Sequence, residues 1–191
     1  MRTAGIVVAV LLSAANARAD RHTVISIGGT FAAKSYSNET QNDPSIDGGA
    51  RISLSFEDAP LGIPGVGLFD HEARLVPELF AGFYTNDTRA RGQVGAGVRA
   101  EWQLARGPMP DTSLGMRMAI YFAARAKISG PDAKPGAEFM IGEYLIGTHD
   151  CRFGWEGGLG LIKRPDLDRS QSPELEALVN IFVGWDSSHR N

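Results

Sequence analysis

The sequence contains a single cysteine, Cys151, so an internal disulfide framework is excluded. After the first segment of the chain no stretch is apolar for 18 residues, and we expect no helix that spans a membrane. Helical spacing of apolar residues is also scarce. Residues 173–179 could begin a helix, but the residues after them alternate between apolar and polar side chains. These absences favour a fold built from β-strands.

Motifs for metal and nucleotide chemistry are absent as well. There is no pair of cysteines, no His-x-His and no two histidines at helical separation, so we expect no metal and no cofactor. The glycines of 154–160 lie within a strand pattern and do not precede a helix, as a phosphate-binding loop would. His149 and Cys151 are a candidate pair of base and nucleophile, but a single cysteine beside a turn more often has no catalytic role. We therefore predict no catalytic residue.

The first nineteen residues have the pattern of an export signal. Arg2 supplies a positive start, residues 5–12 form a short apolar stretch, and residues 17–19 (Ala-Arg-Ala) form a cleavage site. The apolar stretch is far shorter than the roughly 20 residues of a spanning helix. We expect residues 1–19 to be a cleaved signal peptide and residues 20–191 to form one domain.

Cleavage would make the chain more acidic. The full sequence has 19 Lys and Arg against 22 Asp and Glu, a net charge of −3, and the loss of two arginines would bring it to −5. An acidic chain is a poor match for nucleic acid, so we expect no nucleic-acid partner. Glycine is abundant at 23 residues, which suits tight turns and packed strands better than helices.

Alternation of apolar and polar residues recurs in runs of about ten residues, the pattern of β-strands. The expected strands lie near 22–33, 49–57, 72–84, 90–104, 113–127, 137–147, 151–163 and 174–186. The phase of the sixth strand is left open, because Glu138 and Glu143 fall on opposite faces. Turn residues fill the connections, of which 34–48 and 58–71 are the longest. The predicted fold class is all-β, a single antiparallel up-and-down barrel of about eight strands.

Alternation alone does not say which face of a barrel points inward, since a soluble barrel buries its apolar face and a membrane barrel turns it to lipid. Here five or six apolar residues on each of about eight strands exceed what an eight-stranded interior holds. Strands of about ten residues also match the 9–11 that a tilted strand needs to cross a bilayer. We therefore predict a membrane-spanning barrel whose apolar face meets lipid.

The polar face mixes arginine and glutamate with glycine. In a narrow lumen, glycines make room for long side chains, and the near balance of the two signs lets each buried charge find a partner. The candidates for lumenal ion pairs are Arg51, Glu57, Arg74, Glu78, Arg99, Glu101, Arg117, Arg125, Arg152, Glu156 and Glu176. We predict that these residues plug the lumen.

Aromatic residues gather near strand ends, where an interfacial girdle would lie. The girdle candidates are Phe56, Trp102, Tyr144, Trp155 and Trp185. Loop lengths fit less well, because outer-membrane barrels have short periplasmic turns and long outer loops. With the N-terminus in the periplasm, the periplasmic connection 58–71 is long and the external connection 85–89 is short. Either the register differs or this asymmetry is weak in the chain.

With its signal peptide, eight alternating segments, charged lumen and last strand 179–185 (VNIFVGW), the chain resembles the small eight-stranded outer-membrane barrels, namely the membrane domain of outer-membrane protein A and proteins X and W. The resemblance covers most of the mature chain and rests on pattern, without a sharp motif. It implies a Gram-negative outer membrane, and outer-membrane lipid and the barrel-assembly machinery as partners. Members usually end on an aromatic residue that this machinery reads, whereas here residues 186–191 follow Trp185.

The leading hypothesis is a non-enzymatic outer-membrane barrel with a structural, adhesive or minor porin-like role and an external partner that the sequence does not identify. The first alternative is a soluble periplasmic or secreted barrel that binds an apolar ligand, although the first strand lacks the Gly-x-Trp of lipocalins. The second is a lipid A-modifying barrel enzyme, a deacylase or acyltransferase. The deacylases of this type carry His and Ser two residues apart on one strand face, and His22, His71 and His149 lack that serine.

Overall fold

The structure, a computed structural model of the chain, describes residues 23–34, 45–57, 61–68, 71–85, 90–104, 117–130, 133–147, 151–162 and 174–186. Within these ranges the strands are β1 (Thr23–Lys34), β2 (Ser45–Phe56), β3 (Leu61–Leu68), β4 (His71–Thr85), β5 (Ala90–Leu104), β6 (Arg117–Ser129), β7 (Lys134–Ile146), β8 (Cys151–Ile162) and β9 (Glu174–Asp186). The predicted signal peptide, 1–19, lies outside the described residues. In the described ranges there is no helix long and apolar enough to cross a membrane.

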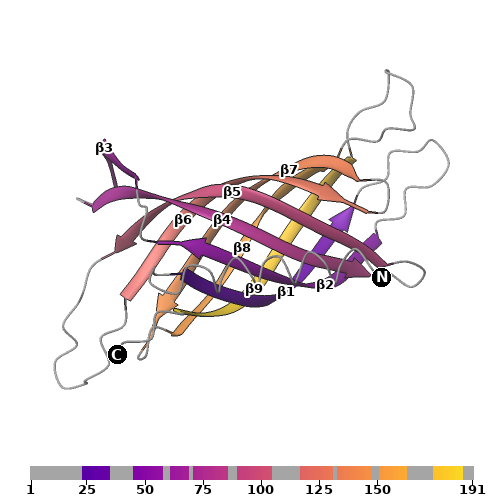
Figure 1. The fold of residues 1–191 in the computed structure, drawn as a ribbon, viewed down its shortest axis with the longest axis horizontal. Coiled ribbons are helices and arrows are strands. Elements are labelled where there is room, and N and C mark those ends of the chain that lie inside the picture. The colour runs from indigo at the N-terminus through magenta and orange to yellow at the C-terminus, as the bar shows by residue number, and fades with distance from the viewer. Residues whose placement is uncertain are drawn as a thin grey trace.

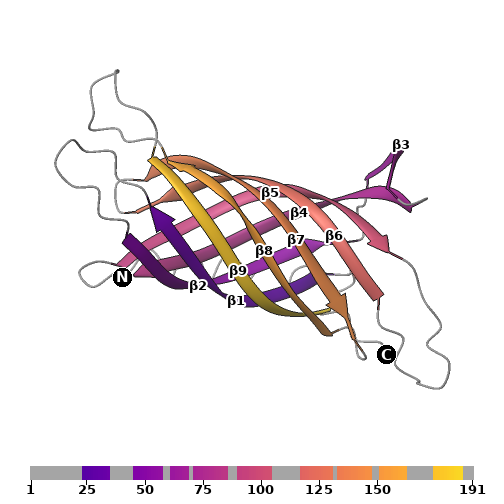
Figure 2. The ribbon, with the colours of Figure 1, turned by 180° about the vertical axis from the view of Figure 1, so that it is seen from behind.

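Eight of these strands close into an antiparallel barrel, which Figures 1 and 2 show from opposite sides. The wall follows the chain order, with two exceptions: β2 pairs directly with β4, and β1 pairs with β9. Full closure satisfies the backbone of every wall strand on both sides and leaves the wall without an edge. The predicted fold class, an all-β up-and-down barrel of eight strands, is confirmed.

The remaining strand, β3, extends the sheet beyond the wall. Its residues 61–63 pair with residues 73–75 of β4, and the register shifts between Ile63 and Gly67. Figure 1 shows β3 at the end of the barrel, beside the start of β4. This segment was predicted to lie inside the connection 58–71 and not to form a strand, because one proline and three glycines in eight residues have the composition of a loop.

The strand limits agree best where alternation is unbroken. The predicted strands 90–104 and 174–186 coincide with β5 and β9. By contrast, β2 begins at Ser45, four residues before its predicted start, because two consecutive glycines there carry no side chain to mark the alternation. Residues 113–116 of the predicted fifth strand lie outside the described residues.

With the exception of Glu143, charged side chains point into the barrel, together with apolar ones such as Phe80, Met140 and Leu178, and the exposed large apolar side chains point out of it. On the outer face Phe139 is 57% exposed and Ile181 is 46% exposed, whereas the inward Glu101 and Glu138 are both 0% exposed. The structure also shows which face of β7, the sixth predicted strand, points inward: Glu138 is inside the barrel and Glu143 is outside. This distribution is the reverse of a soluble barrel, as the sequence analysis predicted.

The outward apolar residues form a belt, which we call the apolar belt. Among the described residues, nineteen large apolar side chains are exposed, and every wall strand contributes at least one. Within the belt, Leu54 and Ala81 are buried in a small cluster with neighbours on β1, β2 and β4. A soluble monomer rarely exposes a continuous apolar surface that encircles the molecule.

Candidate functional site

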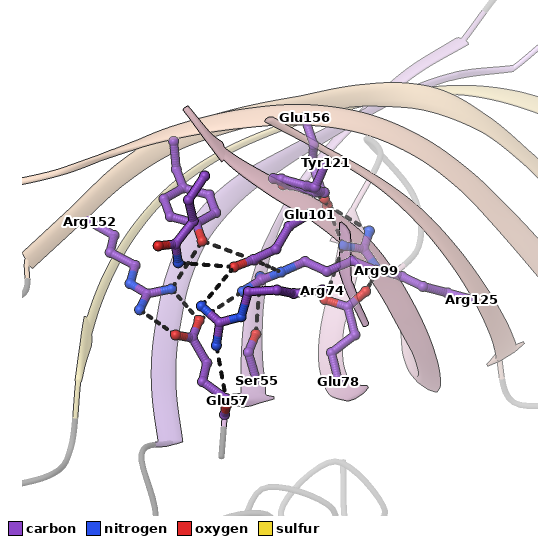
Figure 3. Close-up of polar contacts among 12 residues, drawn as sticks. Ser55, Glu57, Arg74, Glu78, Arg99, Glu101, Tyr121, Arg125, Arg152 and Glu156 are labelled. Atoms are coloured by element: carbon purple, nitrogen blue, oxygen red, sulfur yellow. Dashed lines mark hydrogen bonds and ion pairs between the residues drawn. The ribbon is translucent and has the colours of Figure 1, made fainter. Parts of the chain in front are cut away.

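The lumen, meaning the inward faces of the eight wall strands, holds a network of ion pairs that crosses the barrel (Figure 3). In the described part of the chain, eleven ion pairs join six cations to six carboxylates, so the charges of this set cancel. Its members are Arg51, Arg74, Arg99, Arg125, Lys127 and Arg152, with Glu57, Glu78, Glu101, Glu138, Glu156 and Glu176. Every side chain except that of Arg74 is at most 10% exposed, so the charges are taken out of water and neutralise one another.

Arg125 of β6 is at the centre of this network. Arg125 Nη1 lies 2.7 Å from Oε1 of Glu156, and Nη2 lies 2.7 Å from Oε2 of the same carboxylate. The guanidinium also binds Glu78. Glu156 in addition accepts a hydrogen bond from the Tyr121 hydroxyl at 2.9 Å and from the Asn180 amide at 2.6 Å. Bidentate contacts of this kind are the strongest form of ion pair, because geometry and charge act together. Strands β4, β6, β8 and β9 are thus joined across the lumen.

A second group lies where β2 ends. Glu57 follows the last residue of β2, and both of its carboxylate oxygens bind Arg152, while Arg99 Nη2 lies 3.1 Å from one of them. Burial raises the pKa of Glu57, but the hydrogen bond and charge of Arg152, with the charges of Arg99 and Arg74, outweigh it and hold the pKa below its ordinary value. Glu57 is therefore ionised at neutral pH.

Tyr144 belongs to this second group, which corrects a prediction. Tyr144 was predicted to belong to the aromatic girdle, but its side chain is 1% exposed and its hydroxyl donates a hydrogen bond to Glu101 at 2.9 Å. Arg99 Nε reaches the same carboxylate oxygen at 3.0 Å. The physical reason is the period of two along β7, which places Tyr144 on the same inward face as Glu138 and Met140.

A third group lies toward the other end of the barrel. Lys127 Nζ is 3.2 Å from Glu138 Oε1 and 2.8 Å from Glu176 Oε2, and Arg51 Nη1 is 3.0 Å from Glu138 Oε2. The predicted set of lumenal residues omitted both Lys127 and Glu138. Lys127 could have been predicted from the sequence, since it stands two residues after Arg125 on the same strand and so on the same face. Glu138 could not be assigned, because the inward face of its strand had been left open.

Ten of the eleven predicted lumenal residues lie in the network. The eleventh, Arg117, is the first residue of β6, and its side chain falls outside the described part of the structure.

Of the girdle candidates, Trp155 and Trp185 are 46% and 42% exposed on the outer face. Trp102 is also on this face but buried, with its ring edge-to-face against Phe122 at 5.8 Å, and Phe56 is half-buried. That these four residues mark a membrane interface stays a prediction.

Glycines on the inward faces leave space for the long side chains. A Cβ added at Gly97 would lie 2.6 Å from Cγ of Arg125, and one added at Gly142 would meet the ring of Tyr121. The Arg51 guanidinium also stacks on the Phe80 ring, 3.6 Å from its centroid, a contact that is favourable when desolvated. The lumen is therefore packed by side chains that bind each other. Separately, within the described ranges no group of three or more His, Cys, Asp or Glu side chains could hold a metal ion.

A solved structure of similar fold agrees with this architecture. No family model matches the chain, and no curated protein matches it either. Among solved structures, the crystal structure of the outer membrane enzyme PagL matches with a TM-score of 0.54 and 10% sequence identity, over 84% of this chain and 98% of that one. The crystal structure of Neisserial surface protein A (NspA) matches with a TM-score of 0.49 and 10% identity, over 85% and 96%. At this identity the likeness to PagL shows the fold alone, that of a small closed β-barrel.

Proposed function

We propose that this chain is an outer-membrane β-barrel that crosses the bilayer, holds its lumen closed by ion pairs and presents its loops to the surroundings. Its role in this proposal is structural or adhesive and not enzymatic. One observation carries the proposal, the reversed polarity of the wall, with charged residues inside and the apolar belt outside. PagL is an outer membrane enzyme, but its activity is not carried over to this chain, because the likeness is one of fold.

The energetics of the belt favour lipid over water around the barrel. Taking a large apolar side chain out of water is worth about 1.5–3 kcal/mol, and nineteen such side chains are exposed on the described wall. The lumen cannot compensate for their exposure, since its buried apolar cluster, which includes Met140 and Leu178, shares the interior with the network of charged side chains. A bilayer around the belt supplies the missing burial. This also disfavours the soluble lipocalin-like alternative, whose ligand would need an apolar interior.

An outer-membrane location follows from the same features. Closed barrels with an apolar outer band about 25 Å tall are the form in which β-strands cross that membrane, and the expected export signal directs the chain through the inner membrane first. Lipid around the belt and the barrel-assembly machinery are the partners that this location implies. Membership of the group of outer-membrane protein A and proteins X and W stays part of the proposal.

The first test is behaviour in the cell envelope and on a gel. Because the belt needs lipid and the closed barrel resists unfolding, the protein should sediment with outer membranes and require detergent for extraction. Unboiled and boiled samples should then migrate differently on a denaturing gel, since only boiling opens the barrel. A protein that stays soluble and monomeric without detergent would refute the proposal and favour the lipocalin-like alternative.

The lumen should be closed to ordinary solutes. An eight-stranded interior is just wide enough for side chains to fill, and here Arg125, Glu156 and their partners bind each other across it. Planar bilayers that contain the purified protein are therefore expected to lack a large, steady conductance of the porin type. A stable open channel in this measurement would contradict the closed lumen and would point to a wider barrel or an assembled pore.

A further inference from the structure

Glu143 is an exception to the reversed polarity of the wall. Among the strand side chains that the structure describes, it is the one charged side chain that points out of the barrel. Glu143 is on β7, and the residues paired with it on the two adjacent strands are Ile120 on β6 and Trp155 on β8, both on the apolar belt. A charged residue on a lipid-facing surface is destabilising unless it has a partner, and for that reason marks a candidate functional position.

Among the residues that the structure describes, Glu143 makes one polar contact within the belt. Trp155 Nε1 donates a hydrogen bond to Glu143 Oε1 at 2.7 Å, and the Trp155 side chain is 46% exposed. An ionised carboxylate can accept about four hydrogen bonds, so this contact orients Glu143 without saturating it. The pair therefore presents a negative charge beside an accessible aromatic ring.

The pair lies between the middle and one edge of the apolar belt, with Leu145 and Phe153 between it and the strand ends. Glu143 is three residues from the end of β7 at Ile146, and Trp155 is four residues from the start of β8 at Cys151. With a rise of about 3.3 Å per residue and a tilt of roughly 40°, these positions are about 8–10 Å from the strand ends along the barrel axis. The pair therefore lies below the level of the head groups, and an ammonium must reach inward from the strand ends to meet the Glu143 carboxylate.

We infer that Glu143 and Trp155 form a lipid-binding site for a head group that carries a primary ammonium, as in phosphatidylethanolamine. This inference rests on the proposed function, because it requires the belt to lie in a bilayer. Charge complementarity selects a cation as the occupant. The ammonium donates hydrogen bonds to the carboxylate of Glu143, and the face of Trp155 attracts the same charge. The acyl chains lie along exposed neighbours toward the bilayer centre, such as Ile141 and Phe122.

The test is competition between two lipids of equal net charge. The mature protein is reconstituted into vesicles with equal shares of phosphatidylethanolamine and phosphatidylcholine, extracted in mild detergent and analysed for bound lipid by mass spectrometry. Phosphatidylethanolamine should be enriched about two- to fivefold over phosphatidylcholine, in line with coupling in partly exposed ion pairs. A quaternary ammonium has no N–H to donate, so equal binding or a preference for phosphatidylcholine would overturn the inference.

Two variants locate the site. Glu143→Gln retains an oxygen for the Trp155 N–H but removes the charge, and should return the ratio of bound lipids to that of the vesicle. Ile128→Gln places the same amide on the belt in β6, where Ile128 is 49% exposed, and should leave the enrichment intact. Enrichment that survives Glu143→Gln, or that is lost in Ile128→Gln to the same extent, would refute the assignment.

Two further readouts separate this inference from the proposed function. The shift between unboiled and boiled samples shows whether each variant is folded and inserted. A wild type that inserts but binds both lipids equally overturns the inference and leaves the membrane barrel intact, whereas failure to insert overturns the proposed function itself. If Glu143→Gln instead dissociates an oligomer in pure phosphatidylcholine vesicles, the partner of Glu143 is a protein cation and the lipid site is refuted.

Discussion

Arg125→Met is expected to destabilise the barrel by about 3–5 kcal/mol, the cost of removing one partner from a buried ion pair. The Arg125 side chain is 5% exposed, and it binds both oxygens of Glu156 as well as Glu78. Methionine fills a similar volume but leaves two carboxylates buried in the lumen without their central cation. The measurement is equilibrium urea unfolding of the protein in lipid vesicles, followed by tryptophan fluorescence.

Arg74→Met is the matched control, because it makes the same substitution on the same inward face. The Arg74 side chain is 32% exposed, and its contacts are longer, 3.9 Å to Glu101 and 3.4 Å to the Glu57 carbonyl oxygen. Partly exposed pairs contribute about 0–1 kcal/mol, so the loss should be small. In the double variant Arg125→Met/Glu156→Gln, part of the stability should return, since one stranded charge is removed. Equal losses for Arg125→Met and Arg74→Met would contradict the buried network.

Ile181→Arg is expected to cost about 2–4 kcal/mol, the penalty for an arginine that faces lipid at the middle of the bilayer. Ile181 is at the middle of β9 and opposite Trp155 on the belt, with 46% of its surface exposed. The control is Ile46→Arg near the start of β2, where Ile46 is 75% exposed. Close to the interface the same substitution costs about 0–1 kcal/mol. Urea unfolding in vesicles measures both, and equal costs would argue against a bilayer around the belt.

Much of the architecture could be predicted because a strand has a period of two. Wherever a strand alternates without interruption, one assigned residue fixes the face of all the others, which is how Arg99 and Glu101 were placed in the lumen together. The same rule failed on β7, where Glu138 and Glu143 are five residues apart and so on opposite faces. Without a second criterion the phase stayed open, and Tyr144 was assigned to the wrong side of the wall.

Other features depend on geometry that a linear pattern does not contain. Arg152 and Glu57 bind each other although 95 residues separate them, and their meeting is set by the stagger of the strands around the closed wall. The pairing of β3 with β4 was hidden because its glycines and proline carry little strand propensity. The site at Glu143 was missed for a related reason, since its outward orientation has meaning only once the rest of the belt is known to be uncharged.

The central claim, that the apolar face meets lipid and the charged face lines the lumen, has a direct test on one strand. In a Cys151→Ser background, Ile181→Cys and Asn180→Cys each take a nitroxide spin label, and the two side chains point to opposite faces of β9. In vesicles, the label at position 181 should respond to oxygen and to a nickel chelate carried on lipid, and the label at position 180 should not. If both labels respond only to water-soluble reagents, or position 181 is shielded from lipid, the protein is not a membrane-spanning barrel of reversed polarity.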